Sequence, residues 1–181
     1  VIPGTNHADN VIDFMGSPYE HSTFTSDYID PISYSNLNCN LRKLSFFSFN
    51  IQSLSSKFSE LKELIEGFNS NNCAPDIICL QELWQFVDPS IFSLSGYNHI
   101  IYKLRNNGQG GGVGFYVKSN LKFRILQQYS TFVDRVFESL FIEITLPNST
   151  KNVVGTIYRS GTPHPTLSQS EQFETFLELL S

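Results

Sequence analysis

Glu82 is the residue whose type and position most clearly suggest chemistry. It follows Gln81 at the end of the run Asp76–Leu80, which is apolar apart from its first residue. A short Ile-rich run after a proline is typical of a buried strand, in which charge is scarce. In open α/β sheets, ligands bind outside the carboxyl ends of the strands. Glu82 is therefore a candidate metal or substrate ligand; the alternative is an ordinary polar residue at a strand end.

The segment before this strand supplies a neighbour for Glu82. Residues 44–51 are rich in aromatic side chains, as strands are, and contain Asn50 near their end. A helix is expected next, with Ser55 or Ser56 as its N-cap. Its apolar residues recur at helical spacing: Phe58, Leu61, Leu64, Ile65 and Phe68. Because a β-α-β crossover makes its two strands parallel, Asn50 and Glu82 should meet at one edge of the sheet.

A second carboxylate, Glu138, lies within the predicted strand 136–146. It shares its parity with the apolar residues of that strand, which should face the core. A buried carboxylate must be paired or hydrogen-bonded, so Glu138 is a second candidate for the site. The alternative is a strand-end glutamate bonded to a nearby arginine, such as Arg135 or Arg159.

Residues 106–112 form a glycine-rich turn, N-N-G-Q-G-G-G, between the predicted strands 97–103 and 113–117. Two strands around such a turn predict a β-hairpin. The glycines could instead cradle a phosphate, but no helix and no Lys-Ser/Thr pair follows, which argues against a P-loop. A plain tight turn is the favoured interpretation.

The remaining segments continue the alternation of elements. Residues 121–127 and 152–158 are predicted strands, and Asn148–Thr150 is a predicted hairpin turn. Ser168 and Glu171 form a capping box ahead of an amphipathic helix that carries no stop signal. About seven strands and two helices in this order predict an α/β fold with antiparallel hairpins mixed into the sheet.

Composition indicates a globular chain of one domain. It has 181 residues, of which 40% are hydrophobic and 14% aromatic, which is enough for a core. No apolar run approaches the roughly 18 residues of a membrane span, so we expect no membrane partner. The three cysteines lack C-x-x-C spacing, which favours a reducing compartment and argues against structural zinc.

The net charge of −5 is uneven along the chain. Residues 1–40 hold five acidic residues and no lysine or arginine, while the rest is balanced. The charge alone therefore does not argue for a polyanionic partner. Because residues 1–40 also lack periodicity, we interpret them as an irregular leader or linker and residues 41–181 as the domain.

Five motifs follow one another in the sequence: S-F-N-I-Q-S-L (48–54), D-I-I-C-L-Q-E-L-W (76–84), G-G-G-V-G-F-Y-V (110–117), E-S-L-F-I-E-I (138–144) and G-T-I-Y-R-S-G (155–161). In this order they resemble the amino-terminal part of the endonuclease/exonuclease/phosphatase superfamily, and above all the endonuclease domain of LINE-type (non-LTR) retrotransposons. The resemblance implies a four-layered α/β sandwich with mixed β-sheets, like that of DNase I, and Mg²⁺-dependent cleavage of DNA phosphodiester bonds.

The resemblance also implies roles for individual residues. Asn50 would position the scissile phosphate and the nucleophilic water, Glu82 would bind the metal, and Tyr158 would contact the phosphate near the transition state. Gln81 and Arg159 would support substrate binding. Mg²⁺ prefers carboxylate and keeps waters and phosphate oxygens as its other ligands, and Mn²⁺ is a possible substitute. The metal would polarise the phosphoryl oxygen and stabilise the leaving 3′-oxygen.

The sequence departs from the family pattern after Tyr158. The family's Asp-x-Asn motif and its closing Asp-His pair are missing, and the only later histidine, His164, lies between two prolines. We therefore expect an incomplete, inactive domain that is truncated at its C-terminus and belongs to a parent with a following reverse transcriptase domain. The expected DNA substrate implies a nuclear or cytoplasmic, intracellular location.

The alternatives to a retrotransposon endonuclease are an abasic-site repair nuclease, a phosphatase for inositol or sphingolipid substrates, and a non-catalytic form of the fold.

Overall fold

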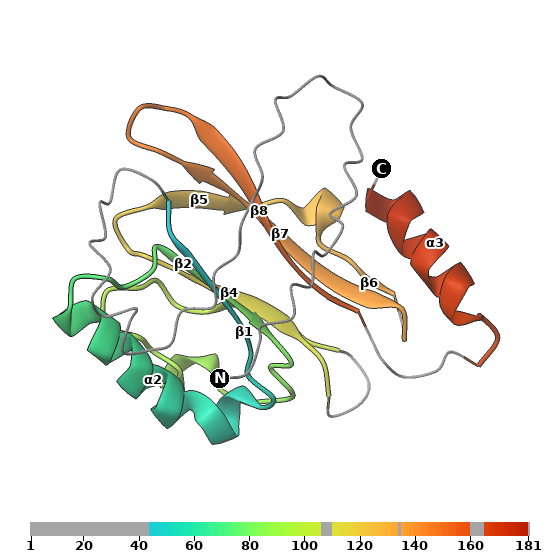
Figure 1. Cartoon of the computed structure of the whole chain (residues 1–181), viewed down its shortest axis with the longest axis horizontal. Coiled ribbons are helices and arrows are strands. Elements are labelled where there is room, and N and C mark those ends of the chain that lie inside the picture. Colours follow the sequence, from blue (N-terminus) through green and yellow to red (C-terminus); the bar gives the residue numbers. More distant parts are fainter. Residues whose placement is uncertain (1–43, 106–109, 134, 160–164, 181) are drawn as a thin grey trace, which may run out of the picture.

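A computed structural model describes residues 44–105, 110–133, 135–159 and 165–180 (Figure 1). The predicted leader at residues 1–40 lies outside these residues. The described strands are β1 (Phe46–Asn50), β2 (Ile77–Gln81), β3 (Ile101–Lys103), β4 (Val113–Val117), β5 (Lys122–Ile125), β6 (Phe132–Val133), β7 (Phe137–Thr145) and β8 (Lys151–Arg159). The α-helices are α2 (Leu54–Ser70) and α3 (Gln169–Leu180), and short 3-10 helices cover Pro89–Ile91 and Gln127–Tyr129. The sequence pattern missed β6, because two residues are too few to show a period.

Four strands form the first sheet, in the order β1-β2-β4-β3. β1 and β2 are parallel, with Asn50 opposite Gln81, and α2 connects them, which confirms the predicted β-α-β unit. β4 is antiparallel to both β2 and β3, which confirms the hairpin around the glycine-rich turn. The first sheet is therefore mixed, as expected.

Helix α2 begins earlier than predicted. Its N-cap is Ser53 and not Ser55 or Ser56, and the Ser53 hydroxyl accepts a hydrogen bond from the Ser56 N–H (3.3 Å). The reason is packing: Leu54 is fully buried, so the first helical turn belongs to the core. Serines close together in the sequence do not reveal which of them precedes the first buried apolar residue.

Replacing Ser53 by alanine should lower the free energy of unfolding by about 1 kcal/mol, because α2 loses its cap. Ser55→Ala, at an exposed position inside the helix, should change it by less than about 0.5 kcal/mol. Urea unfolding followed by circular dichroism measures both variants, and equal effects would contradict the assignment of the cap.

Strand β7 is the centre of the second sheet. It pairs with β8 along its whole length, while β5 and β6 pair with the two ends of its other edge, all antiparallel. The predicted turn at Asn148–Thr150 joins β7 to β8, and there the Leu146 N–H donates to the Thr150 carbonyl (2.9 Å). In this register Glu138 lies opposite Tyr158.

Two apolar clusters show how the layers stack. One cluster packs α2 against the first sheet and includes Leu61, Ile65, Ile78, Leu80 and Tyr116. The other fills the space between the two sheets and includes Cys79, Phe115, Leu140, Ile142 and Ile144. Successive side chains of a strand point to opposite faces, so β2 contributes to both clusters. The predicted core face of β7 is confirmed.

Helix α3 contacts the outer face of the second sheet. It begins with the predicted capping box, in which the Ser168 N–H donates to Glu171 Oε2 (2.7 Å) and the Glu171 N–H to Ser168 Oγ (3.3 Å). Phe176 packs edge-on against Phe137 of β7, with ring centroids 5.1 Å apart. Burial of these two rings attaches the helix near the start of β7.

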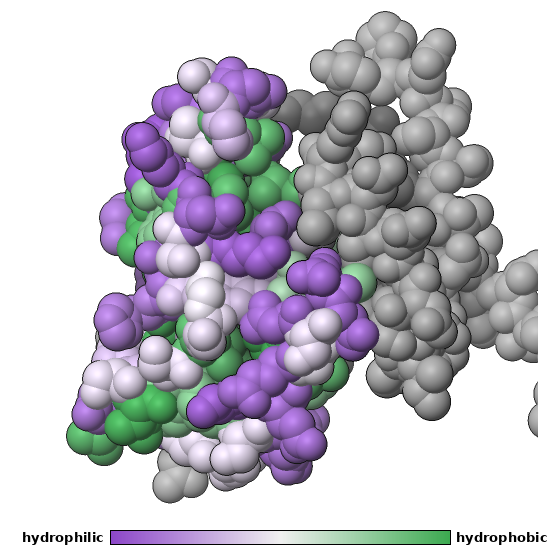
Figure 2. Space-filling model, turned by 90° about the vertical axis from the view of Figure 1, so that its left-hand side faces the viewer, coloured by the Kyte–Doolittle hydropathy of each residue, from purple (hydrophilic) through white to green (hydrophobic). Residues whose placement is uncertain are grey.

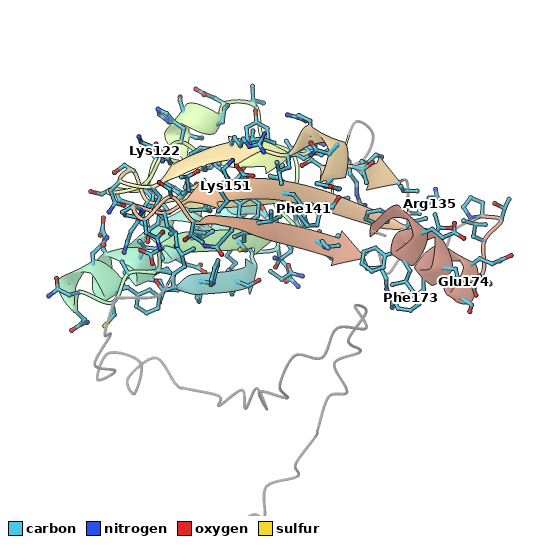
Figure 3. All side chains as sticks on the ribbon, turned by 90° about the horizontal axis from the view of Figure 1, so that it is seen from above. Lys122, Arg135, Phe141, Lys151, Phe173 and Glu174 are labelled. Atoms are coloured by element: carbon cyan, nitrogen blue, oxygen red, sulfur yellow. The ribbon has the colours of Figure 1, made fainter. Side chains whose placement is uncertain are left out.

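The two ends of the second sheet carry different side chains. Figure 3 shows Arg135 and Phe173 at the end near α3, and Lys122 and Lys151 at the opposite end. Because Tyr158 lies near the carboxyl end of β8, it belongs to the α3 end of the sheet.

The surface side shown in Figure 2 is mostly hydrophilic, with smaller hydrophobic areas between the polar side chains. Among the described residues, no helix is both long and apolar enough to cross a membrane. The predicted α/β fold with mixed β-sheets is confirmed as a two-sheet fold. The complete four-layered sandwich and the C-terminal truncation stay predictions.

Candidate active site

The chain turns sharply after β2. Glu82 and Trp84 both adopt left-handed backbone conformations, with φ of 56° and 58°. Four backbone hydrogen bonds of 2.8–3.2 Å hold this turn: the N–H groups of Leu83 and Trp84 donate to the glycine-rich turn, and the carbonyls of Glu82 and Leu83 accept from the start of α2. Non-glycine residues in this conformation cost about 1–3 kcal/mol each and persist where the surroundings fix them. Three segments therefore determine where Glu82 points.

Three donors converge on the Glu82 carboxylate. Trp84 Nε1 (2.8 Å) and the Gly111 N–H (2.9 Å) donate to Oε2, and the Tyr158 hydroxyl also donates to the carboxylate. Partial burial raises the pKa of Glu82, but these bonds and the charge of Arg105 outweigh it, so the pKa lies below its ordinary value. Glu82 is therefore fully ionised at neutral pH.

Tyr158 reaches Glu82 from the second sheet. Its ring packs against the apolar cluster between the sheets. Burial and the hydrogen bond to Glu82 raise the pKa of Tyr158 to about 12. Its hydroxyl therefore keeps its proton at neutral pH and is a hydrogen-bond donor. A carboxylate and a phenol, 76 positions apart in the sequence, meet at one point between the sheets.

Glu138 is buried between the sheets, with 2% of the residue exposed. Its Oε1 accepts a hydrogen bond from Arg105 Nε, and its Oε2 accepts one from the Gly112 N–H. Burial raises the pKa of Glu138 more than these two partners lower it, and the nearby charge of Glu82 adds to the rise. The expectation that this core-facing carboxylate is paired is confirmed.

The partner of Glu138 differs from the one that the alternative interpretation names. For a strand-end glutamate we expect a nearby arginine such as Arg135 or Arg159, but the partner is Arg105, which follows β3 of the first sheet. Arg159 lies on the outer face of β8, where its guanidinium carbon is 5.8 Å from the centroid of the Phe173 ring. Glu138 points inward, so it meets a residue of the facing sheet. The substrate contact expected of Arg159 stays a prediction.

The glycine-rich turn serves the two carboxylates directly. The N–H of Gly111 donates to Glu82 and that of Gly112 to Glu138. Both glycines have positive φ, 77° and 90°. A Cβ atom at Gly111 would collide with Arg105 and Glu138. These two described residues of the turn thus present backbone donors to protein carboxylates, which goes beyond the plain tight turn that we predict from the sequence.

Asn50 and Gln81 end the two parallel strands side by side. Gln81 Nε2 donates to Thr156 Oγ1 (2.8 Å) and to Ser48 Oγ (3.2 Å), which ties the first sheet to β8. Asn50 is exposed and lines a cavity of about 240 Å³ beside α2. The parallel crossover thus brings Asn50, Gln81 and Glu82 to one edge, as the sequence predicted.

Sequence reasoning missed two residues of this cluster. Arg105 carries the positive charge between the two carboxylates, and Trp84 supplies an indole donor to Glu82. Arg105 directly precedes the glycine-rich turn, and a basic residue in that position was the available signal. Trp84 closes the same motif as Glu82, but no periodicity marks a side chain that turns back onto its own strand end.

Residues 47–180 match the model of the Endonuclease/Exonuclease/phosphatase family. The chain belongs to this family. The matched span includes every residue of the cluster around Glu82. Enzymes of the Endonuclease/Exonuclease/phosphatase family generally use a divalent metal ion.

Several solved structures are similar to part of the chain. Humanized D. rerio TDP2 with 14 mutations is 18% identical, with a TM-score of 0.48 over 76% of this chain and 57% of that chain. D. rerio TDP2 in complex with a single-strand DNA product is 17% identical, with a TM-score of 0.48 over 77% of this chain and 55% of that one. The 3′ phosphatase NExo from Neisseria, bound to a product DNA hairpin, is 16% identical, with a TM-score of 0.38 over 61% of this chain and 40% of that one. The chain thus spans less than two thirds of each of these structures. A comparison with curated proteins finds no match.

The protein ligands that the site at Glu82 offers fit a Mg²⁺ ion. Within the part of the chain that the structure describes, no three His, Cys, Asp or Glu side chains gather at one place. An ion here would therefore take one protein carboxylate, and Mg²⁺ is commonly held by one or two carboxylates together with waters and phosphate oxygens. The ionised Glu82 suits this role. Glu138 suits it less, because it is buried between the sheets with 2% of the residue exposed, which leaves no room for the waters that such an ion keeps.

Proposed function

We propose that the protein hydrolyses DNA phosphodiester bonds with Mg²⁺, as an endonuclease of the LINE retrotransposon type. The observation that carries this proposal is the hydrogen bond between Tyr158 and Glu82, which joins a phenol donor of one sheet to an ionised carboxylate of the other. Membership of the family and the five motifs in order support it. Mn²⁺ should substitute for Mg²⁺, and a reverse transcriptase domain should follow in the parent protein. We also propose an intracellular, nuclear or cytoplasmic, location.

Each residue of the site has a distinct part in this proposal. Glu82 would hold the metal, which when bound would polarise the phosphoryl oxygen and stabilise the leaving 3′-oxygen. Tyr158 keeps its proton, and when substrate binds its hydroxyl would turn from Glu82 and donate a hydrogen bond to a phosphate oxygen instead. Asn50, exposed at the same sheet edge, orients the scissile phosphate and the attacking water. Gln81 supports the site through its bond to β8, and Arg159 is the remaining predicted substrate contact.

There are two alternatives to this proposal, one an enzyme and one a protein without catalytic activity. One is another phosphodiesterase or phosphatase of the family, with an abasic site, an inositol phosphate or a sphingolipid as substrate. The other is a non-catalytic form of the fold, which would bind DNA without cleaving it. Substrate preference and metal dependence separate them.

Nicking of supercoiled plasmid DNA tests the proposed function. We would assay the 181-residue chain and a form extended through the downstream reading frame, each with Mg²⁺ and with EDTA. Inositol phosphate and sphingomyelin serve as competing substrates. We expect Mg²⁺-dependent nicking by the extended form and far less by the chain alone. Release of phosphate or headgroup without nicking would overturn the proposal, and equal nicking by both forms would contradict the expected incompleteness.

A further inference from the structure

Arg105 lies at the centre of the cluster around Glu82, but none of the five family motifs contains it. It follows β3, and its side chain is 17% exposed, so it is sheltered without being sealed from solvent. Its Nε donates to Glu138, and its guanidinium carbon lies 6.0 Å from the centroid of the Tyr158 ring. The guanidinium is therefore held beside the phenol that donates to Glu82.

Glu138 fixes the orientation of this guanidinium. The Glu138 side chain is only 3% exposed, and its two oxygens accept from Arg105 and from the backbone of Gly112. The glycine-rich turn thus anchors the carboxylate, and the carboxylate anchors Nε of Arg105. A guanidinium has five N–H donors in a planar fork. Among the described residues, the Arg105 side chain makes one hydrogen bond, through Nε to Glu138, so within this part of the chain its terminal nitrogens can donate to a further acceptor.

The charges of the cluster explain which acceptor fits. Glu82 and Glu138 carry negative charges and Arg105 a positive one, which leaves one net negative charge. A divalent cation at Glu82 would reverse the sign to one net positive charge. A phosphodiester carries one negative charge and would neutralise the occupied site. Arg105 acts electrostatically on both Glu82 and Tyr158, so an anion bound between those groups would lie within its range as well.

Other basic residues of these strands point elsewhere. The amino group of Lys103 donates to the carbonyl of Ser130. Arg159 lies over Phe173 on the outer face of β8. Arg105 is thus the basic residue that the described structure places against the Glu82 and Tyr158 pair.

We infer that Arg105 is a phosphate-binding residue of the Glu82 site, and that Glu138 is the positioning residue that aims it. This inference rests on the proposed function for its choice of ligand, a nucleic-acid phosphate. It adds a cationic contact that is separate from the substrate contact predicted for Arg159.

The salt dependence of DNA binding tests the inference. The 181-residue chain and its variants would be titrated with a short fluorescein-labelled DNA duplex in CaCl₂, over a range of KCl concentrations, with anisotropy as readout. Each phosphate contact adds about 0.9 to the slope of log affinity against log salt. Arg105→Gln should therefore reduce the magnitude of the slope by about 0.9 and weaken binding about tenfold at the lowest salt. A slope equal to that of the unmodified chain would overturn the inference.

Two further variants separate the phosphate contact from a loss of structure. Arg105→Gln alone leaves Glu138 buried without its cation, so the double variant Arg105→Gln/Glu138→Gln removes both charges together. It should show the same reduced slope with restored thermal stability. Arg124→Gln is the matched control, because Arg124 also pairs through Nε with a glutamate, Glu143 (2.9 Å), on an exposed face. A slope reduced equally in Arg124→Gln would contradict a specific contact at Arg105.

The binding and cleavage measurements can fail independently of each other, so the phosphate contact and the proposed function are tested separately. A reduced slope in the Arg105 variants without any Mg²⁺-dependent nicking would support the phosphate contact while the proposed function fails. Nicking together with an unchanged slope would overturn the phosphate contact while the proposed function stands.

Discussion

Replacing Glu82 by glutamine is expected to lower Mg²⁺-dependent cleavage by roughly 100-fold or more, because the ion loses its protein carboxylate. Glutamine keeps the length of the side chain and an oxygen that can accept from Trp84 and Gly111. The turn after β2 should therefore persist while the negative charge disappears. Initial rates of plasmid nicking by the extended form, at saturating Mg²⁺, measure the effect.

Glu63→Gln is the control for this substitution. Glu63 is an exposed glutamate of α2, and removing its charge alters the net charge of the chain by the same amount. Its nicking rate should stay within about twofold of the unmodified rate, in keeping with the small effects of surface substitutions. Cleavage by the Glu82→Gln variant at the rate of the control would contradict a metal-binding role for Glu82.

Gly111→Ala is expected to lower the free energy of unfolding by about 3 kcal/mol, which is more than we expect for Ser53→Ala. A left-handed residue with a Cβ costs about 1–2 kcal/mol, and Gly111 has φ of 77°. The added methyl group would also meet Arg105 and Glu138, and overpacking of this kind costs about 1–3 kcal/mol. Urea unfolding followed by circular dichroism measures the loss.

Gly96→Ala separates the backbone cost from the collision. Gly96 has a similar φ of 84°, but a Cβ there meets no atom within 4 Å. Its loss should be limited to the backbone cost of about 1–2 kcal/mol. Equal losses at the two positions would show that the collision of the added methyl group with Arg105 and Glu138 contributes nothing to the loss of stability.

The edge of the sheet that carries Asn50, Gln81 and Glu82 could be predicted from the sequence. Two apolar runs with a helix of regular period between them leave one arrangement, and parallel strands then bring their carboxyl ends together. The inward direction of Glu138 followed in the same way from the period of β7. Local patterns sufficed here because each element is long enough to show its period.

The contacts between the sheets could not be predicted in this way. The sequence suggests an arginine close to Glu138 in its own sheet or turn as the partner, whereas the partner, Arg105, comes from the facing sheet. The donors of the glycine-rich turn were missed because backbone N–H groups leave no trace in residue type. Ser53 became the N-cap because Leu54 is buried, and burial depends on the packing of the whole domain.

The most direct test of the site is a Mg²⁺ titration of the fluorescence of Trp84, which is the only tryptophan of the chain and donates its indole N–H to Glu82 (2.8 Å). An ion bound by Glu82 should change the surroundings of the indole. We predict a saturable change in the emission of the 181-residue chain with MgCl₂ that reverses with EDTA and is absent from the Glu82→Gln variant. No change in the unmodified chain, or the same saturable change in both proteins, would contradict a metal site at Glu82.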